Sequence, residues 1–384
     1  MRLCYIADVT SIHAQRWANY FAERGHEVHL VSRRYTEGCE GLNSTIRVHP
    51  LIRLVPLPQV SHVSACLCAL PWVLQVRSLV KKTKADIVHA DFIGVPGYLG
   101  ATSGFHPLVL SARGSDIMIV PKQNFVYRFF TKQALKRADC IICVSSALRE
   151  EIIKLGASPN KIEMTPIGVD TGKFSPRLRN EALLRMLEID ESPVVISTRS
   201  LKPIYDVRTL VKAIPLVLAE IPQARFVIAG AGEQQGYLRE LARDLGVSDN
   251  TKFIGWVPQT ELPKYLSSAD IYVSSSLSDG TSISLLEAMA CELAPIVTDI
   301  PANRPWINEG ENGFLFPVRD HRTLASKIIY LLKNQEIRED FGRRSRDIVQ
   351  QNAEEETEMG KLERIYHELV QADASLRKQD NLSA

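Results

Sequence analysis

The segment Ser278–Ala290 joins two carboxylates to hydroxyl groups at the expected start of a helix. Asp279 and Glu287 stand eight positions apart, after a short apolar strand. The free N–H groups and the positive dipole end of a helix that begins near residues 281–284 suit a diphosphate. Glu287 can accept hydrogen bonds from a ribose diol, and Asp279 can hold sugar hydroxyls. The alternative is a capped helix whose glutamate is solvated.

Two series of short apolar strands alternate with helical segments, as in parallel sheets that are covered by helices on both faces. They divide near residues 171–193 and predict an α/β protein of two Rossmann-like domains that face a central cleft. The expected domains are residues 1–175 and 176–353, followed in 354–384 by a C-terminal helix and a tail that frays from Asp373. The expected strands are 2–7, 28–32, 86–90, 108–112, 140–145, 194–197, 225–229, 252–254, 271–273 and 296–298, and the main helices are 14–23, 125–137, 209–220, 236–245, 284–290 and 324–333.

The composition is that of an ordinary globular protein. Of the 384 residues, 45% are hydrophobic and 23% charged, which excludes a disordered chain. The net charge of +2 gives no indication of a nucleic-acid partner, but residues 1–175 carry +8 and residues 176–384 carry −6. The N-terminus is too short and polar for a signal peptide. The uncharged stretch 54–76 contains three prolines, so it is expected to form a loop and then a buried or interfacial helix rather than a membrane span.

The cysteine and glycine patterns argue against a metal or redox site and against a dinucleotide-binding site. Cys140 and Cys143 lie in an expected buried strand with no second pair and no histidine cluster, which favours core thiols in a reducing compartment. No Gly-x-Gly-x-x-Gly follows the first strand, which disfavours a nicotinamide dehydrogenase. The glycines of the later segment Gly230–Gly236 are interpreted as a tight turn.

The chain resembles the retaining glycosyltransferases of family 4. The Asp279–Glu287 pair, followed by Ala-Met-Ala-Cys and by a strand that ends Val-Thr-Asp, resembles their glutamate-x7-glutamate motif. The resemblance covers nearly the whole chain and implies the two-domain GT-B fold, with an N-terminal acceptor domain and a C-terminal nucleotide-sugar domain. It also implies metal-independent transfer with retention of configuration, and no cofactor. The other segments that resemble the family are Arg24–Leu30, Gly114–Asp116, Ala138–Ser145, Pro166–Asp170, Lys252–Pro258 and Ala269–Ser274.

Three positions depart from the family pattern. Asp279 stands where the family usually has Glu, so the contact with the sugar must shift or pass through water. The family pairs an Arg with a Lys on the donor diphosphate. Here Arg199 is kept, Tyr205 stands at the aligned Lys position, and Lys202 is near enough in sequence to substitute. Arg113 replaces a frequent His, either as a cation for an anionic acceptor or the donor phosphates, or as a surface residue.

The resemblance assigns roles to residues in both halves of the chain. The expected catalytic residues are Asp279, Glu287 and Arg199. The expected donor-binding residues are Arg199, Lys202, Gly255, Trp256, Val257, Thr281, Ser282, Ile283 and Glu287. The expected acceptor-binding residues are His13, Arg113 and Asp116. His13 is placed on the first loop, where a solvated histidine is the alternative, and Trp256 either stacks on the base or packs in the core.

The resemblance implies transfer of a sugar from a nucleoside-diphosphate sugar to a lipid-linked or saccharide acceptor, in cell-surface polysaccharide or glycolipid synthesis. The alternatives are a nucleotide-sugar epimerase of the same fold and a non-catalytic nucleotide-sugar-binding scaffold. Basic and apolar residues gather in 67–84 and 122–137, so we expect a cytoplasmic protein that is peripheral on the anionic inner face of the plasma membrane. The alternative for the second segment is that Phe125, Phe129 and Phe130 pack into the core.

Overall fold

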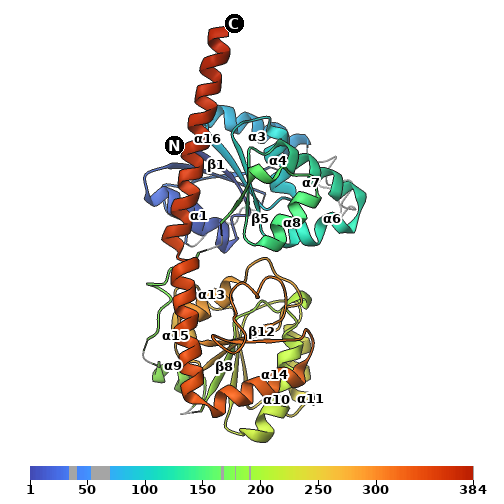
Figure 1. Ribbon diagram of the computed structural model, residues 1–384, viewed down its shortest axis with the longest axis vertical. Coiled ribbons are helices and arrows are strands. Elements are labelled where there is room, and N and C mark those ends of the chain that lie inside the picture. The colour runs from blue at the N-terminus through green and yellow to red at the C-terminus, as the bar shows by residue number, and fades with distance from the viewer. Residues whose placement is uncertain (34–40, 53–69, 166–167, 178, 190–191, 384) are drawn as a thin grey trace. The chain divides into compact units, whose positions relative to one another are not determined.

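The structure, a computed structural model, describes residues 1–33, 41–52, 70–165, 168–177, 179–189 and 192–383. The chain divides into two compact units, residues 1–166 with 358–384 and residues 167–357. Each unit has one parallel sheet flanked by helices, which confirms the α/β class and the two Rossmann-like domains (Figure 1). The division lies at residues 166/167, whereas the sequence places it near residue 175.

The first unit contains a seven-stranded sheet in the order β3-β2-β1-β4-β5-β6-β7. Its strands are β1 (Arg2–Ile6), β2 (Glu27–Ser32), β3 (Arg47–Pro50), β4 (Ile87–Asp91), β5 (Leu108–Ala112), β6 (Cys140–Cys143) and β7 (Ile162–Met164). Its helices are α1 (Ile12–Glu23), α3 (Leu70–Thr83), α4 (Val95–Ser103), α5 (Ser115–Met118), α6 (Val120–Gln123), α7 (Phe125–Arg137) and α8 (Ser146–Lys154), with a short 3₁₀ turn at Pro159–Lys161. Strands β4, β5 and β6 are buried along their whole length, as parallel strands covered on both faces must be.

The last helix, α16 (Glu355–Ser383), packs against the first unit from residue 358 onward. The side chains of Leu362 and Tyr366 are fully buried there, and the ring of Tyr366 stacks on that of Phe21 with centroids 5.0 Å apart. The tail expected to fray from Asp373 is helical to Ser383. That expectation was wrong because the Ala, Leu, Arg, Lys and Gln residues there are good helix formers.

The second unit contains a six-stranded sheet in the order β10-β9-β8-β11-β12-β13. Its strands are β8 (Val194–Ser197), β9 (Arg225–Ala229), β10 (Thr251–Gly255), β11 (Ile271–Ser274), β12 (Ala294–Thr298) and β13 (Phe314–Phe316). Its helices are α9 (Glu181–Met186), α10 (Val207–Glu220), α11 (Gln235–Asp244), α12 (Leu262–Leu266), α13 (Ile283–Ala290), α14 (His321–Lys333) and α15 (Gln335–Asn352), with a 3₁₀ turn at Pro203–Tyr205. Two apolar clusters fill the unit, and the sheet contributes side chains to both.

Two further expectations concern cysteines and membranes. Cys4, Cys140, Cys143 and Cys291 are free and buried, as expected for core thiols, and burial raises the pKa of Cys140 to about 12. Cys39, Cys66 and Cys68 lie outside the described residues. In the described ranges no helix is both long enough and apolar enough to cross a membrane. Of the uncharged stretch, only residues 70–76 are described as helix, the start of α3.

Candidate functional site

Arg199 lies in the loop that follows β8, and the structure brings it to the start of α13. Its Nη1 donates to the hydroxyls of Ser282, at 2.5 Å, and Ser284, at 2.8 Å. Its Nη2 donates to Oδ2 of Asp279 at 2.5 Å. Strands β8 and β11 are neighbours in the sheet, so the loops after them meet at its carboxyl edge. Two segments about 80 residues apart in the chain therefore form one charged cluster.

Asp279 supplies the counter-charge for Arg199. Burial of the guanidinium opposes its charge, but the Asp279 carboxylate more than compensates, and the pKa of Arg199 is raised above its ordinary value. The side chains are only 8% and 16% exposed. Nε of Arg199 has no hydrogen-bond partner among the described residues. A buried cation with unused donor capacity at a helix N-terminus is suited to an anion.

Tyr205 occupies one face of the same guanidinium. The Cζ atom of Arg199 lies 4.2 Å from the centroid of the Tyr205 ring, a cation–π arrangement. A lysine here would repel Arg199 unless an anion lay between them, whereas the aromatic face attracts it. Lys202 is exposed, and no side-chain hydrogen bond or ion pair holds it within the described ranges.

Two glycines let the Arg199 loop approach the loop after β9. A Cβ atom on Gly230 would lie 2.2 Å from the carbonyl oxygen of Arg199, and one on Gly232 would lie 2.3 Å from that of Leu201. These are closer than atoms can come, so both positions require glycine. The expected turn is present, since the N–H of Gln235 donates to the carbonyl of Gly232 at 3.1 Å, and the close approach of the two backbones fixes the position of Arg199.

Helix α13 begins at Ile283, within the predicted range. Ser282 is its N-cap and accepts a hydrogen bond from the N–H of Leu285 at 3.3 Å. Thr281 is 7% exposed, and Ile283 is half-buried. Ser282 therefore caps the helix and also accepts from Arg199, which ties the cation to the positive end of the helix dipole.

Glu287 lies in α13 and is 3% exposed, so the solvated-glutamate alternative is wrong. The side-chain amide of Gln259 donates to its Oε1. Gln259 directly follows the Gly255–Pro258 segment and was not predicted from the sequence; its only signal is this position. The amide therefore helps to hold the carboxylate in one orientation.

The segment after β10 presents an exposed aromatic ring. Gly255 has a φ of +76°, and its carbonyl accepts from the N–H of Gly230 at 2.7 Å. Trp256 is 63% exposed, so the alternative that it packs in the core is wrong. Val257 is half-buried against the apolar cluster beneath. Trp256 thus exposes its ring to solvent on the segment that also carries Gln259.

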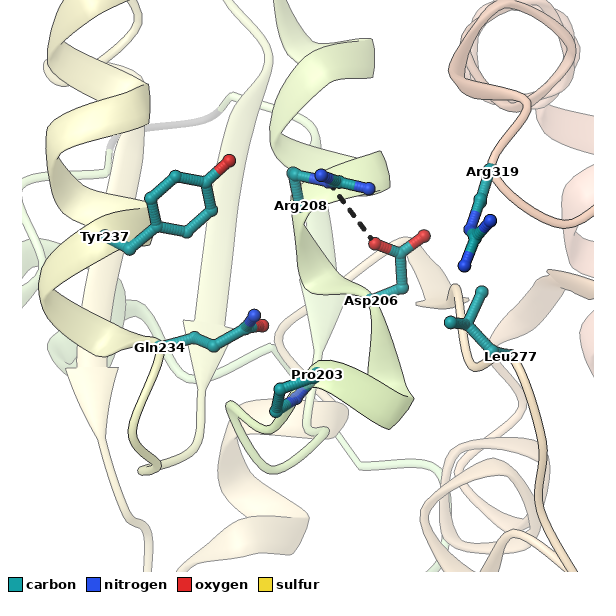
Figure 2. Close-up of a pocket in the computed structure, with 7 residues that line it drawn as sticks. All are labelled: Pro203, Asp206, Arg208, Gln234, Tyr237, Leu277 and Arg319. Carbon is teal, nitrogen blue, oxygen red and sulfur yellow. Dashed lines mark ion pairs between the residues drawn. The ribbon is translucent and has the colours of Figure 1, made fainter.

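A separate pocket of about 430 Å³ opens at the same end of the sheet (Figure 2). Arg208 is ion-paired with Asp206 at 3.6 Å, while Tyr237 lies on α11. None of the predicted donor residues lines it. The lining residues are Pro203, Asp206, Arg208, Gln234, Tyr237, Leu277 and Arg319.

In the first unit, Arg113 follows β5 and is largely buried, with a side chain 10% exposed. The surface-residue alternative is therefore wrong. Its Nε donates to Asp91 at 2.5 Å, and its Cζ lies 4.3 Å from the centroid of the Trp17 ring. Nη1 and Nη2 are buried without a hydrogen-bond partner among the described residues. Asp91 thus holds one edge of the Arg113 guanidinium and Trp17 covers one face, while the two Nη groups remain available as donors.

Asp116 fixes the loop that carries Arg113. Its carboxylate is fully buried and accepts from the N–H groups of Ile93, Arg113 and Gly114 at 2.8–3.0 Å. Burial raises the pKa of Asp116 in spite of these bonds. Its role as a direct acceptor contact stays a prediction, and the geometry gives it a positioning role.

His13 lies in the first turn of α1 rather than on the loop. The expected location was wrong because Ser11 caps the helix, accepting from the N–H of Ala14, so the helix begins at Ile12. Burial, reinforced by the charges of Arg113 and Arg16, lowers the pKa of His13 to about 3. Its Nδ1 is buried without a partner in the described structure, so the solvated-histidine alternative is wrong. His13 is a neutral imidazole near neutral pH.

His89 lies in β4. Its ring is fully buried, contacts the Tyr366 hydroxyl through Nδ1 and lies 2.8 Å from Ser111 Oγ through Nε2. Both ring nitrogens are therefore used, and His89 anchors α16 within the first unit.

Comparisons with known proteins identify the family of the chain. The family model described as "Glycosyl transferases group 1" matches residues 181–348, and "Glycosyl transferase 4-like" matches residues 2–145. N-acetyl-alpha-D-glucosaminyl L-malate synthase of Bacillus anthracis is 25% identical over 92% of each chain. UDP-Gal:alpha-D-GlcNAc-diphosphoundecaprenol alpha-1,3-galactosyltransferase of Escherichia coli is 27% identical over 67% of this chain and 68% of its own.

The solved structure of Anabaena Alr3699/HepE in complex with UDP-glucose superposes with a TM-score of 0.81, over 96% of this chain and 100% of that one, at 17% identity. That identity establishes the fold alone, which is GT-B. The two family models together span most of the chain, with the match to group 1 over the unit that holds Arg199 and Glu287. The chain therefore belongs to the group 1 glycosyltransferases of family 4.

Proposed function

We propose that this glycosyltransferase retains anomeric configuration and moves a hexosyl or related sugar from a nucleoside-diphosphate sugar to a lipid-linked or saccharide acceptor, in cell-surface polysaccharide or glycolipid synthesis. The observation that carries the proposal is the buried Arg199, held by Asp279 and by the first hydroxyls of α13. The relatives' names support it, since one acts with UDP-Gal and a diphosphoundecaprenol acceptor.

The donor diphosphate binds Arg199 and the start of α13. The leaving nucleoside diphosphate gains negative charge as the glycosidic bond breaks, and fixed donors stabilise that charge without reorganising. N–H or hydroxyl groups come from Thr281, Ser282 and Ile283. Lys202 is an exposed cation three residues after Arg199. No Asp-x-Asp metal motif occurs in the sequence, and these fixed cations and donors serve metal-independent transfer.

The remaining donor contacts divide between nucleoside and sugar. Glu287, oriented by Gln259, accepts from the ribose hydroxyls. Trp256 and the backbone of Gly255 and Val257 contact the base. Oδ1 of Asp279 accepts from the N–H of Gly280 at 2.9 Å. The Asp279 carboxylate holds the sugar hydroxyls. When the diphosphate binds, it replaces Asp279 as a partner of part of the Arg199 guanidinium.

Arg113 and His13 form the acceptor side. The unused Nη groups of Arg113 provide two adjacent donors in the geometry that suits a carboxylate or phosphate. His13, neutral near pH 7, can donate or accept one hydrogen bond without adding charge. An acceptor, or a donor group, that carries an anion fits this pair, and the L-malate named for one relative is such an acceptor.

The decisive experiment incubates the protein with radiolabelled nucleotide sugars, a lipid extract and oligosaccharides. We expect label to pass to lipid or saccharide, with the same anomeric configuration in product as in donor by NMR. An isomerised donor would identify an epimerase, and binding without turnover would identify a scaffold. Either result would overturn the proposed transfer.

Peripheral membrane binding rests on the face of α6 and α7 that we call the basic–aromatic face. Phe125 is 83% exposed and Phe129 55%, whereas Phe130 is half-buried with its ring 4.7 Å from that of Tyr98. The core alternative is therefore wrong for Phe125 and Phe129. The exposed basic residues of this face are Lys122, Arg128, Lys132, Lys136 and Arg137.

Helix α3 adds Leu70 and Leu74, which are 63% and 56% exposed. It packs on α4, which in turn packs on α7, so the apolar residues belong to one layer of helices. Lys81 and Lys82 lie in its last turn. The segment 67–69 lies outside the described residues. Exposed apolar groups beside clustered cations are typical of surfaces that bind anionic lipid.

We expect the protein to bind anionic vesicles at low salt and to leave them as salt is raised. Each basic residue at the leaflet contributes about 1 kcal/mol, so replacing the five residues of the basic–aromatic face by Gln should abolish sedimentation with the vesicles. A matched variant, with Gln at exposed Arg185, Lys212, Arg243, Arg322 and Arg343 of the second unit, has the same net charge and should still sediment. Wild-type protein that stays in solution at low salt would contradict the membrane role.

A further inference from the structure

A histidine-rich cluster joins α16 to the turn between α1 and β2. It consists of His26, Glu363 and His367, and one nitrogen or oxygen of each lies within 4.8 Å of those of the other two. Nε2 of His26 lies 2.7 Å from Oε1 of Glu363, and the two imidazole centroids are 6.1 Å apart. Two imidazoles and a carboxylate are a common ligand set for zinc. None of these residues belongs to the proposed transfer site.

The two helical ligands are held in place by the buried face of α16. Glu363 and His367 are four residues apart and therefore lie on one side of the helix. Leu362 and Tyr366, which precede each of them, are fully buried in the first unit. The backbone that carries both ligands is thus fixed over the turn that carries His26.

Further polar groups orient the ligand atoms from outside. Oε2 of Glu363 accepts from the Tyr20 hydroxyl at 3.4 Å and lies 3.9 Å from Nε of Arg24, which leaves Oε1 directed at His26. Arg24 stacks on the Tyr20 ring at 3.6 Å, so its position is fixed by that ring. The Met1 nitrogen lies 3.2 Å from Nδ1 of His26, so the ring nitrogen directed at Glu363 is Nε2. Such outer partners hold the first ligands of metal sites in orientation.

We infer that His26, Glu363 and His367 bind a divalent cation of the zinc class. Bonds of about 2.0–2.1 Å in a tetrahedron place ligand atoms about 3.4 Å apart. The observed separations, from 2.7 Å to at most 4.8 Å, lie near this value. His367 is exposed, so the fourth position is open to water. The ion fastens α16 to the first unit and supplies no step of the transfer.

The site is tested by titrating the metal-free, full-length protein with Zn²⁺ against a chromophoric chelator. We expect one site in the wild type. In both His367→Ala and Glu363→Gln we expect an affinity loss of at least about 100-fold, more than the loss of an outer partner causes. Glu368→Gln, one residue from the site on the same helix, is the matched control and should bind as the wild type does. Unchanged binding in both ligand variants, or no stoichiometric binding in the wild type, would overturn the inference.

Two further measurements separate this site from the cysteines and from a purely structural contact. Co²⁺ in the site should give d–d bands without the near-ultraviolet thiolate charge-transfer band, and that band would assign the ion to cysteine instead. Zn²⁺ should raise the midpoint of thermal unfolding of the wild type and of Glu368→Gln, but not of His367→Ala. A rise of equal size in His367→Ala would contradict the proposed role.

Discussion

Replacing Glu287 by Ala should nearly abolish sugar transfer. The variant loses charge-assisted hydrogen bonds to two ribose hydroxyls, each worth about 1.5–3 kcal/mol, which together lower kcat/KM by a factor of roughly 10²–10⁴. The loss should also appear as weaker binding of the nucleoside diphosphate alone, measured by calorimetry, because the ribose belongs to that part of the donor. Because Glu287 is only 3% exposed, its replacement can also destabilise the fold, so the thermal unfolding of the variant must be measured together with its activity.

Two variants make the Glu287 result specific. Glu287→Gln keeps the volume and an oxygen for Gln259 but loses the charge, so it should fold as the wild type does and still lose most activity. Gln259→Ala keeps the carboxylate and removes one contact that orients it, so its loss of activity should be smaller. If Glu287→Ala and Asp279→Ala both keep wild-type turnover, the donor site lies elsewhere.

The sheets could be predicted from the sequence because buried parallel strands are short apolar runs. All ten expected strands are present, and the part of the chain that the structure describes has three more, β3, β7 and β13, of three or four residues each. All three are outermost strands of their sheets. Runs this short do not show a period in the sequence. The carboxyl-edge position of Asp279 and Glu287 followed directly from the strand before them.

The contacts within the site could not be predicted in the same way. Arg199 meets Asp279 because β8 and β11 are neighbours, and strand order is not a local property of either segment. The hydrogen bond from Gln259 to Glu287 depends on where β10 ends in space relative to α13, which neither segment's sequence specifies. The stacking of Tyr205 on Arg199 depends on a loop whose path is fixed by Gly230 from another strand.

Replacing Arg199 by Ala should lower kcat by about 10²–10³, the scale of one lost donor to charge that develops in the transition state. The change should fall mainly on kcat at saturating donor, since the diphosphate gains charge as it leaves. Arg199→Lys keeps the charge, but an ammonium is a compact group that lacks the planar fork reaching Ser282, Ser284 and Asp279 together, so it should recover only part of the rate. Unchanged activity of Arg199→Ala would move the diphosphate site, with Lys202 the next cation to replace.

The pairing of Arg199 with Asp279 makes a sharper test than either single variant. Without donor, Asp279 neutralises Arg199, and removing it leaves a buried, uncompensated guanidinium beside a helix N-terminus. Asp279→Ala should therefore bind free nucleoside diphosphate at least as tightly as the wild type does while it transfers sugar more slowly. In the double variant the two rate losses should fall well short of adding, because the side chains are bonded directly. Strictly additive losses would mean that the two residues act on the donor independently, and that their ion pair plays no part in holding Arg199 for the leaving group.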